Sequence, residues 1–94
     1  MGNVLSIAIG CHGPVEVANA LHRIGVQGAT IYQCVGMWEG EIEDSTVAHI
    51  CWDKHIDQEG IVDGLFRAFI DQRFLYVNQI ALENPYHEPR TVPS

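Results

Sequence analysis

The fold is decided by residues 31–52, which read IYQCVGMWEGEIEDSTVAHICW. Side chains in the first part of this stretch alternate with the period of two that is typical of a β-strand. One set is Ile31, Val35 and Met37, and the other is Tyr32, Cys34 and Trp38. The same period returns from Ser45 to Trp52, and the acidic run from Glu39 to Asp44 lies between. Glycine and clustered acids suit an exposed turn, so residues 31–52 predict a β-hairpin.

A strand and a helix are expected before this hairpin. Residues 4–10 are apolar and rich in branched side chains, which favours a strand buried on both faces. Pro14 suits a first helical turn, and Gly25 suits a left-handed helix end. Between them, apolar residues fall at helical spacing, namely Val17, Ala20, Leu21 and Ile24. This spacing predicts an amphipathic helix.

A second helix and a closing strand are expected after the hairpin. Asp57 is placed to cap a helix whose positions repeat at the helical period: Val62, Leu65, Phe66, Phe69, Ile70 and Arg73. Residues 74–82 predict the closing strand. Residues 83–94 contain three prolines, which a central strand does not accept. We therefore expect a domain over residues 1–82 and a proline-rich tail over residues 83–94.

The order strand, helix, strand, strand, helix, strand is the split βαβ pattern of ferredoxin-like folds. The predicted fold is α+β, with a four-stranded antiparallel sheet and two helices on one face. On the other face we expect an apolar patch made of Tyr32, Cys34, Trp38, Ala48, Ile50 and Trp52. Large exposed apolar patches mark interfaces, so a homo-oligomer with sites between its subunits is expected.

Composition fits one small globular domain. The chain has 94 residues and a mass of 10.5 kDa, with 47% hydrophobic and 18% charged residues, which is apolar enough for one core. Five Lys and Arg stand against 12 Asp and Glu, and the net charge of −7 argues against nucleic acid as a partner. A cationic ligand or a basic protein suits this charge better.

The sequence also predicts a compartment. The longest uncharged stretches are interrupted by glycine, proline and polar residues, so no membrane-spanning helix is expected. The N-terminus lacks the basic flank of a secretory signal. Cys11, Cys34 and Cys51 form neither an even-numbered disulfide framework nor a Cys-x-x-Cys pair, which favours a reducing cytoplasm.

Two pairs of residues raise the question of a metal site, namely Cys11 with His12 and His49 with Cys51. Structural zinc sites gather four ligands at short spacings, which the chain does not supply, so neither a metal nor a cofactor is expected. Cys11 and His12 lie in a glycine-rich turn between the first strand and the first helix. Backbone N–H groups at such a turn hold anions, so we predict substrate contacts at both residues. Ordinary turn chemistry explains the glycines nearly as well.

Chemistry is expected around the hairpin, where aromatic residues precede four acids. Glu39 and Glu41 fit a solvated tip, because tips tolerate charge. Glu43 stands where the turn gives way to the second strand, so the sheet can aim its carboxylate toward Tyr32 or Trp38. Aromatic faces and a carboxylate suit a cation, which the rings attract and the carboxylate pairs.

Residues 34–45, which read CVGMWEGEIEDS, resemble the hairpin of the small phage-encoded enzymes that degrade S-adenosylmethionine, now understood as lyases. With the strand, the helix and the segment 74–77 that follow, the resemblance covers the middle and later two-thirds of the chain. It implies ferredoxin-fold subunits that assemble as trimers, bind substrate between neighbours and serve antirestriction in the infected bacterial cytoplasm. The chain is short for the family, so contacts that longer termini supply in that family are not carried over.

The resemblance also implies the reaction and its residues. The carboxylate of S-adenosylmethionine attacks its own γ carbon, which yields L-homoserine lactone and 5′-methylthioadenosine. Glu43 corresponds to the family's glutamate and pairs with the α-ammonium. Tyr32 corresponds to the tyrosine that orients the substrate near the sulfonium. Trp38 is placed to stack on the adenine, and Ser45 to donate to a ribose or carboxylate oxygen.

Two other functions fit the sequence. Eight of the 12 acids lie between Glu39 and Asp63, which suits a phage protein that inhibits a host defence protein through an acidic surface. The other is a non-catalytic sponge that binds a nucleotide between subunits. Tyr32 and Trp38 lining a pocket with Glu43 would favour the enzyme, whereas their burial beneath outward acids would favour the inhibitor.

Overall fold

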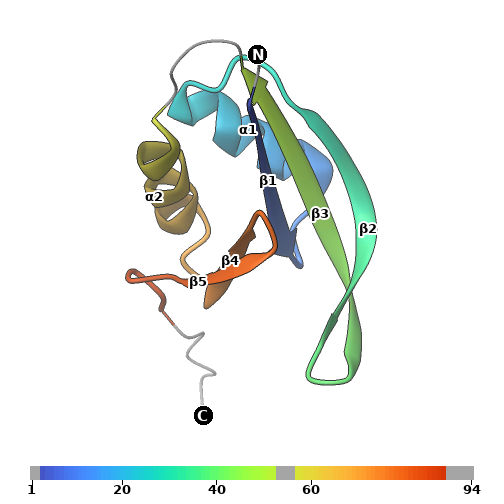
Figure 1. Ribbon diagram of the computed structural model, residues 1–94. Helices are drawn as coiled ribbons and strands as arrows, with labels where there is room; N and C mark the ends of the chain where they lie inside the picture. Colours follow the sequence, from blue (N-terminus) through green and yellow to red (C-terminus); the bar gives the residue numbers. More distant parts are fainter. Residues whose placement is uncertain (1–2, 53–56, 89–94) are drawn as a thin grey trace.

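The chain folds into an antiparallel sheet with two helices on one face (Figure 1). The computed structural model describes residues 3–52 and 57–88, without the side chains of residues 3, 4, 51 and 52. The elements are β1 (Asn3–Gly10), α1 (Pro14–Ile24), β2 (Thr30–Trp38), β3 (Glu41–Trp52), α2 (Gln58–Ala68), β4 (Phe74–Val77) and β5 (Ile80–Glu83). Over the described residues the sheet has five strands in the order β2-β3-β1-β4-β5. The α+β class is therefore confirmed.

The predicted hairpin exists, but its turn is shorter than the sequence indicated. Trp38 pairs with Glu41, so the turn holds only Glu39 and Gly40. Both have positive φ angles, 51° and 80°, as the tight turn of a two-residue hairpin requires. The expected turn over residues 39–44 is wrong, because β3 already begins at Glu41. Glu43 therefore lies inside a strand and is fixed by the ladder.

This short turn also sets which side chains share a face. Cys34 pairs with Ser45, so even-numbered residues of β2 lie on the same face as odd-numbered residues of β3. The predicted apolar patch is wrong for Ala48 and Ile50, which are each 1% exposed and pack in the core beneath the helices. The side chain of Trp52 lies outside the described residues.

The predicted closing strand over residues 74–82 is wrong, because it folds back on itself as the hairpin β4–β5. Asn78 and Gln79 form its turn with φ angles of 50° and 67°. Asparagine tolerates this left-handed conformation because its short polar side chain bonds locally. Asn78 also fixes the hairpin to β1, since its Oδ1 accepts from the Ser6 N–H at 2.9 Å. The sheet therefore gains a fifth strand over the expected four.

Both helices begin where the sequence predicts. Pro14 occupies the first turn of α1, and Gly25 ends it with a φ of 107°. The carboxylate of Asp57 caps α2 by accepting from the Gly60 N–H at 2.9 Å. The helical period continues to Arg73, but α2 ends at Ala68 and Phe69 packs below the helix end at 3% exposure.

The core fills the space between the helices and the inner face of the sheet. In the central strand β1, Leu5, Ile7 and Ile9 are fully buried, whereas Ser6 and Ala8 are only half-buried. The expectation that this strand is buried on both faces is therefore wrong. We call the side of the sheet that no helix covers, on which Ser6 and Ala8 lie, the open face. The rest of the core consists of Val17, Ala20, Leu21, Val26, Ala48, Ile50, Ile61, Val62, Leu65, Phe66, Phe69, Leu75 and Val77.

The segment after β5 packs on α2. Asn84 is 4% exposed, and its amide donates to the backbone carbonyls of Phe66, Phe69 and Gln72 at 3.0–3.3 Å. The Tyr86 hydroxyl donates to Asp63 Oδ1 at 2.6 Å. The boundary between a domain ending at residue 82 and a tail stays a prediction. In the described part of the chain, neither helix has the length and apolar character needed to span a bilayer.

Candidate functional site

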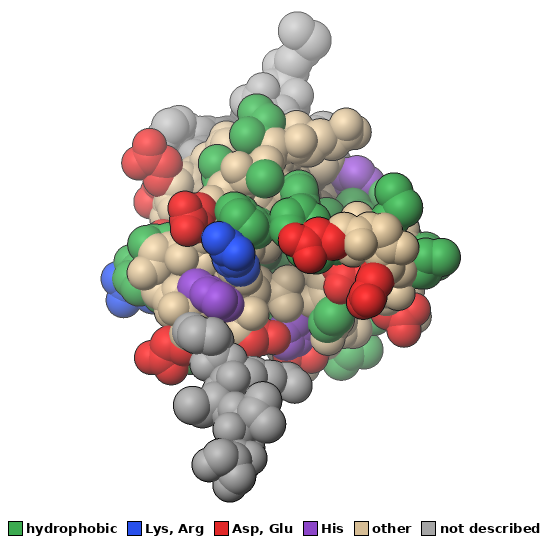
Figure 2. All heavy atoms as spheres, turned by 90° about the horizontal axis from the view of Figure 1, so that it is seen from below, with side chains coloured by type: hydrophobic (Ala, Val, Ile, Leu, Met, Phe, Trp, Pro, Cys, Tyr) green, Lys and Arg blue, Asp and Glu red, His purple; other side chains and the backbone are tan. Residues whose placement is uncertain are grey.

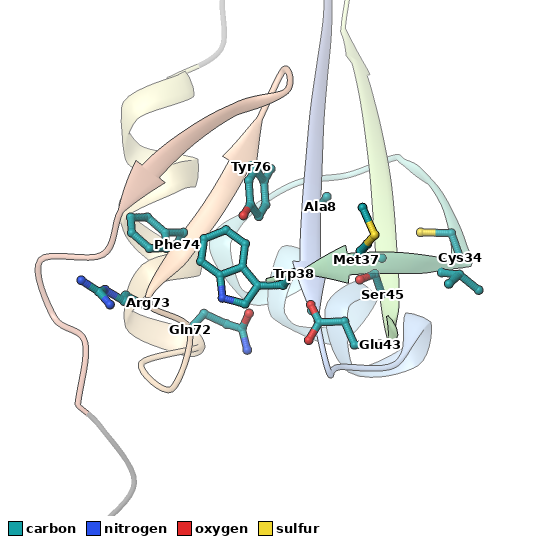
Figure 3. A pocket seen from close by; sticks show the side chains of 13 residues that line it. Ala8, Cys34, Met37, Trp38, Glu43, Ser45, Gln72, Arg73, Phe74 and Tyr76 are labelled. Atoms are coloured by element: carbon teal, nitrogen blue, oxygen red, sulfur yellow. The ribbon is translucent and has the colours of Figure 1, made fainter. Parts of the chain in front are cut away.

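A pocket of about 410 Å³ lies where the open face meets the hairpin β2–β3. Its walls come from four strands and the loop before β4 (Figure 3). Polar and charged groups are few among the lining residues. They include Glu43, Ser45, Gln72 and Arg73.

Two glycines make room for the polar groups of the pocket. A Cβ added at Gly10 would lie 2.5 Å from Glu43 Oε1, and one added at Gly36 would lie 2.5 Å from Ser45 Oγ. Both distances are far below van der Waals contact, so any larger residue must displace these side chains. The Gly10 position also lies 3.6 Å from Gln72 Oε1. Two acceptor oxygens, one of them anionic, therefore converge above Gly10.

Aromatic rings form the wall opposite these oxygens. Figure 3 shows Trp38 between Phe74 and Glu43. The centroid of Trp38 lies 5.7 Å from that of Phe74 and 6.3 Å from that of Tyr76, the latter in an edge-on arrangement. The Arg73 guanidinium lies 5.2 Å from the Phe74 centroid and supports that ring from the rim. Trp38 is 45% exposed, so its indole remains accessible to a ligand.

Besides burial, the negative charge of Glu43 affects the pKa of Tyr76, which also lines the pocket. Burial raises the pKa of the Tyr76 phenol above its usual value, and the negative charge of Glu43 raises that pKa further. The phenol therefore stays protonated at neutral pH and keeps a hydrogen to donate. Glu43 Oε2 in turn accepts from Cys11 Sγ at 3.3 Å.

The structure brings together some of the predicted site residues and separates others. Trp38, Glu43 and Ser45 line the pocket, and Cys11 contacts the Glu43 carboxylate. Tyr32 and His12 are not among the lining residues of this pocket. The enzyme hypothesis expected both Tyr32 and Trp38 to line a pocket with Glu43. Trp38 does so, and Tyr32 does not.

Tyr32 lies on the open face at the other end of β2. Tyr32 pairs with Val47, whereas Glu43 pairs with Gly36, which follows Tyr32 by four residues on β2. Four residues of strand span about 13 Å, too far for the phenol to share a ligand atom with Glu43. The Tyr32 hydroxyl instead lies 2.9 Å from His49 Nε2. His49 Nδ1 lies 2.7 Å from Ser6 Oγ, so three strands are joined by one chain of hydrogen bonds.

His12 is engaged by carboxylates. Its Nδ1 lies 2.7 Å from Glu16 Oε1, and its Nε2 lies 3.0 Å from Asp71 Oδ2. The side chain is 14% exposed and packs on Phe69, with ring centroids 4.6 Å apart. Neither ring nitrogen is therefore left for a substrate.

The pocket residues that the sequence analysis missed include Gln72, Arg73, Phe74 and Tyr76. The aromatic pair at positions 74 and 76 has the spacing of one strand face, which was a usable signal. Their place beside Glu43 depends on β4 pairing with β1, which no local pattern reveals. Among the described residues, no three His, Cys, Asp or Glu side chains gather as metal ligands.

The acids do not form one block on the surface visible in Figure 2. That view shows them spread around the face with hydrophobic side chains between them. Glu39 and Glu41 are exposed at the hairpin tip, whereas Glu43 is half-buried in the pocket. Glu43 is thus set apart from its acidic neighbours by its surroundings.

No protein-family model, curated protein or solved structure matches the chain. Arguments about function therefore depend on the pocket and its chemistry.

Proposed function

We propose that the protein is an S-adenosylmethionine lyase that forms L-homoserine lactone and 5′-methylthioadenosine. The observation that carries this proposal is a pocket that the Glu43 carboxylate shares with Trp38, with Gln72 Oε1 near that carboxylate above Gly10. Such a pocket suits a ligand that carries an ammonium, a sulfonium and a flat aromatic group. S-adenosylmethionine has all three.

The two oxygens above Gly10 bind the α-ammonium of the substrate. Glu43 pairs with its charge, and Gln72 Oε1 accepts a second N–H. Trp38 and Phe74 offer π faces to the sulfonium or the adenine. The Tyr76 phenol, which burial and Glu43 keep protonated by raising its pKa, donates to a substrate oxygen.

The chemistry needs positioning more than proton transfer. One carboxylate oxygen attacks the γ carbon and forms the lactone C–O bond. The C–S bond breaks at the same time, and its electron pair leaves with the sulfur as neutral methylthioadenosine. The carboxylate and sulfonium charges cancel as the ring closes. An apolar wall therefore stabilises the transition state, relative to the charged substrate, better than water does. Holding the methionyl chain folded supplies most of the remaining rate enhancement.

Assembly is part of the proposal. The open pocket on one chain is completed in a ferredoxin-like trimer, in which a neighbour supplies the missing wall. Tyr32 lies away from the pocket of its own chain, so its role in substrate orientation requires the pocket of a neighbour. The setting is the cytoplasm of an infected bacterium, where loss of S-adenosylmethionine protects phage DNA from restriction.

The test is incubation of the purified protein with S-adenosylmethionine, followed by chromatography of methylthioadenosine and mass detection of homoserine lactone. Glu43→Gln removes the charge that pairs with the ammonium, and we expect kcat/KM to fall by about 100-fold. Glu41→Gln is the matched control, because Glu41 lies on the same strand but at the exposed tip. Its kcat/KM stays near the wild-type value.

Other outcomes identify the competing functions. Binding of S-adenosylmethionine without product, measured by calorimetry, replaces the lyase with a nucleotide-binding sponge. Absence of both binding and product removes the proposal and leaves inhibition of a host defence protein as the function to pursue. Full product release by Glu43→Gln removes Glu43 from the mechanism.

A further inference from the structure

A contact between His12 and Asp71 joins two walls of the pocket, although neither residue lines it. His12, in the loop between β1 and α1, places Nε2 3.1 Å and 3.0 Å from the two carboxylate oxygens of Asp71. Asp71 immediately precedes Gln72 and Arg73, which line the pocket. The Gln72 amide also donates to Asp71 Oδ2 at 3.4 Å.

The loop that carries His12 is fixed to the strand of Glu43. Cys11 N–H donates to the Asp44 carbonyl at 2.8 Å, and the hydroxyl of buried Thr46 donates to the His12 carbonyl. Cys11 Sγ donates to Glu43 itself. The His12 ring therefore connects the wall that holds Glu43 to the wall that holds Gln72.

The His12 ring is suited to this task because each of its two nitrogens has its own carboxylate partner. Both ring nitrogens face carboxylate oxygens, which accept hydrogens and do not donate them when ionised. The ring therefore bridges Glu16 on one side and Asp71 on the other. The Glu16 contact is local to the start of α1, whereas the Asp71 contact crosses between distant parts of the chain.

We propose that His12 is a positioning residue of the pocket, which holds Gln72 against Glu43 through its contact with the Asp71 carboxylate. This inference rests on the proposed function only for its kinetic readout. Loss of this contact frees residues 71–73, so Gln72 Oε1 and the Glu43 carboxylate no longer meet above Gly10. The substrate ammonium then loses one of its two partners, and Phe74 shifts against Trp38.

The test compares His12→Phe, Asp71→Asn and their double variant. Phenylalanine retains the stacking on Phe69 but has no N–H, and asparagine retains the shape of Asp71 without its charge. We expect each single variant to lower kcat/KM for S-adenosylmethionine by about tenfold, and the double variant to fall no further, since one contact is lost in all three. The control Glu16→Gln removes the other carboxylate, and its kcat/KM stays within about threefold of wild type.

A second readout needs no substrate. In ¹H–¹⁵N spectra, the Trp38 indole N–H signal moves in the same direction in His12→Phe and Asp71→Asn and stays in place in Glu16→Gln. If wild-type protein neither binds nor cleaves S-adenosylmethionine, the proposed function fails and this spectrum still decides the role of His12. Additive losses in the double variant, or an unmoved indole signal in folded Asp71→Asn, would overturn the inference. Should His12→Phe fail to fold, Asp71→Asn alone decides it.

Discussion

Gly10 and Gly36 hold open the space that Glu43 and Ser45 fill. At Gly10 the atom in the way of a Cβ is the far end of a flexible side chain, Glu43 Oε1. At Gly36 the obstacle is the shorter and stiffer Ser45 side chain, which is 8% exposed. The two positions therefore differ in what a methyl group does: the first moves a functional group, and the second disturbs the sheet.

Gly10→Ala is expected to separate activity from stability. The added methyl displaces the Glu43 carboxylate by about 1 Å, so kcat/KM for S-adenosylmethionine drops by about 100-fold. The midpoint of urea unfolding changes little, because the side chain moves without breaking the core. Gly13→Ala is the control, since a Cβ there meets no atom within 4 Å. Equal activity in the two variants would contradict the role given to Gly10.

The phenol of Tyr76 reports on the charge of Glu43. Burial first, and the Glu43 charge second, raise the pKa of Tyr76. Glu43→Gln removes the second cause, so the pKa of Tyr76 moves down toward its usual value while burial keeps it somewhat raised. A ¹³C-tyrosine NMR titration measures this in wild type and variant. An unchanged titration would mean that the two side chains do not share the pocket.

The same shift links to folding. A raised pKa in the folded state means that the folded protein holds the proton more tightly than the unfolded chain. This contribution is complete below the ordinary tyrosine pKa of about 10 and is lost as pH rises through the folded value. Tyr76→Phe is therefore expected to reduce the decline in unfolding free energy above pH 10, measured by urea titration at several pH values.

At the scale of elements, the two hairpin turns differ in the residue that adopts a positive φ angle, and this difference affects stability. Gly40 takes a φ of 80° at no steric cost, whereas Gln79 takes a φ of 67° with a side chain attached. Gln79→Gly is therefore expected to raise the free energy of unfolding by about 0.5–1 kcal/mol. Urea denaturation checks the value. A loss of stability would show that the Gln79 side chain has a role that its conformation does not reveal.

Asn84 closes the C-terminal end of α2 from outside the helix. Its amide donors serve three carbonyls, and its Oδ1 accepts from Tyr86 N–H at 2.9 Å. Asn84→Ala leaves these buried groups without partners, so we expect a loss of about 2–4 kcal/mol in urea denaturation. Asn19→Ala, on the exposed side of α1, is the control and stays within about 0.5 kcal/mol of wild type.

Sequence patterns predicted the elements better than their boundaries. Pro14, Gly25 and Asp57 carry local physical signals, and each acts as expected. The hairpin turn was misplaced because the acids Glu41, Glu43 and Asp44 are typical of an exposed turn, although positive φ angles at Glu39 and Gly40 suffice to reverse the chain. The split of residues 74–82 was missed because Asn78-Gln79 lacks the glycine that usually marks such a turn.

The candidate site was predictable only where its residues are local. Trp38, Glu43 and Ser45 belong to one hairpin, and the structure places all three in the pocket. Tyr32 shares their strand pair, but the rise along β2 carries it away from Glu43. Gln72 and Tyr76 reach the pocket through the pairing of β4 with β1, and this contact depends on the whole sheet.

At the scale of the molecule, the hairpin β2–β3 extends as an arm beyond the helices (Figure 1). The arm carries apolar side chains that nothing in the described chain covers: Val35 is 71% exposed, and Met37 and Ile42 are each 77% exposed. A surface of this kind suits contact with a second copy. It lies at the pocket, which Val35 and Met37 also line.

We therefore predict that the protein assembles through this arm. Light scattering after gel filtration is expected to give a trimer for the wild type and a smaller species for Met37→Lys with Ile42→Lys. Ile80→Lys, at the edge strand β5, is the control for an exposed apolar residue elsewhere, since Ile80 is 64% exposed. A monomeric wild type would contradict this prediction. It would also contradict the proposal that Tyr32 orients substrate in the pocket of a neighbouring subunit.

The order of strands has a consequence for how the chain is made. β1 lies in the centre of the sheet, where Ser6 pairs with His49 and Ala8 pairs with Tyr76. A ribosome adds roughly 5–20 residues per second, so this first strand waits several seconds for both neighbours to be synthesised. During that time its Leu5, Ile7 and Ile9 lack the cover that the finished core gives them. Chaperones that bind nascent apolar segments therefore have their best opportunity at the first strand, before the last hairpin closes beside it.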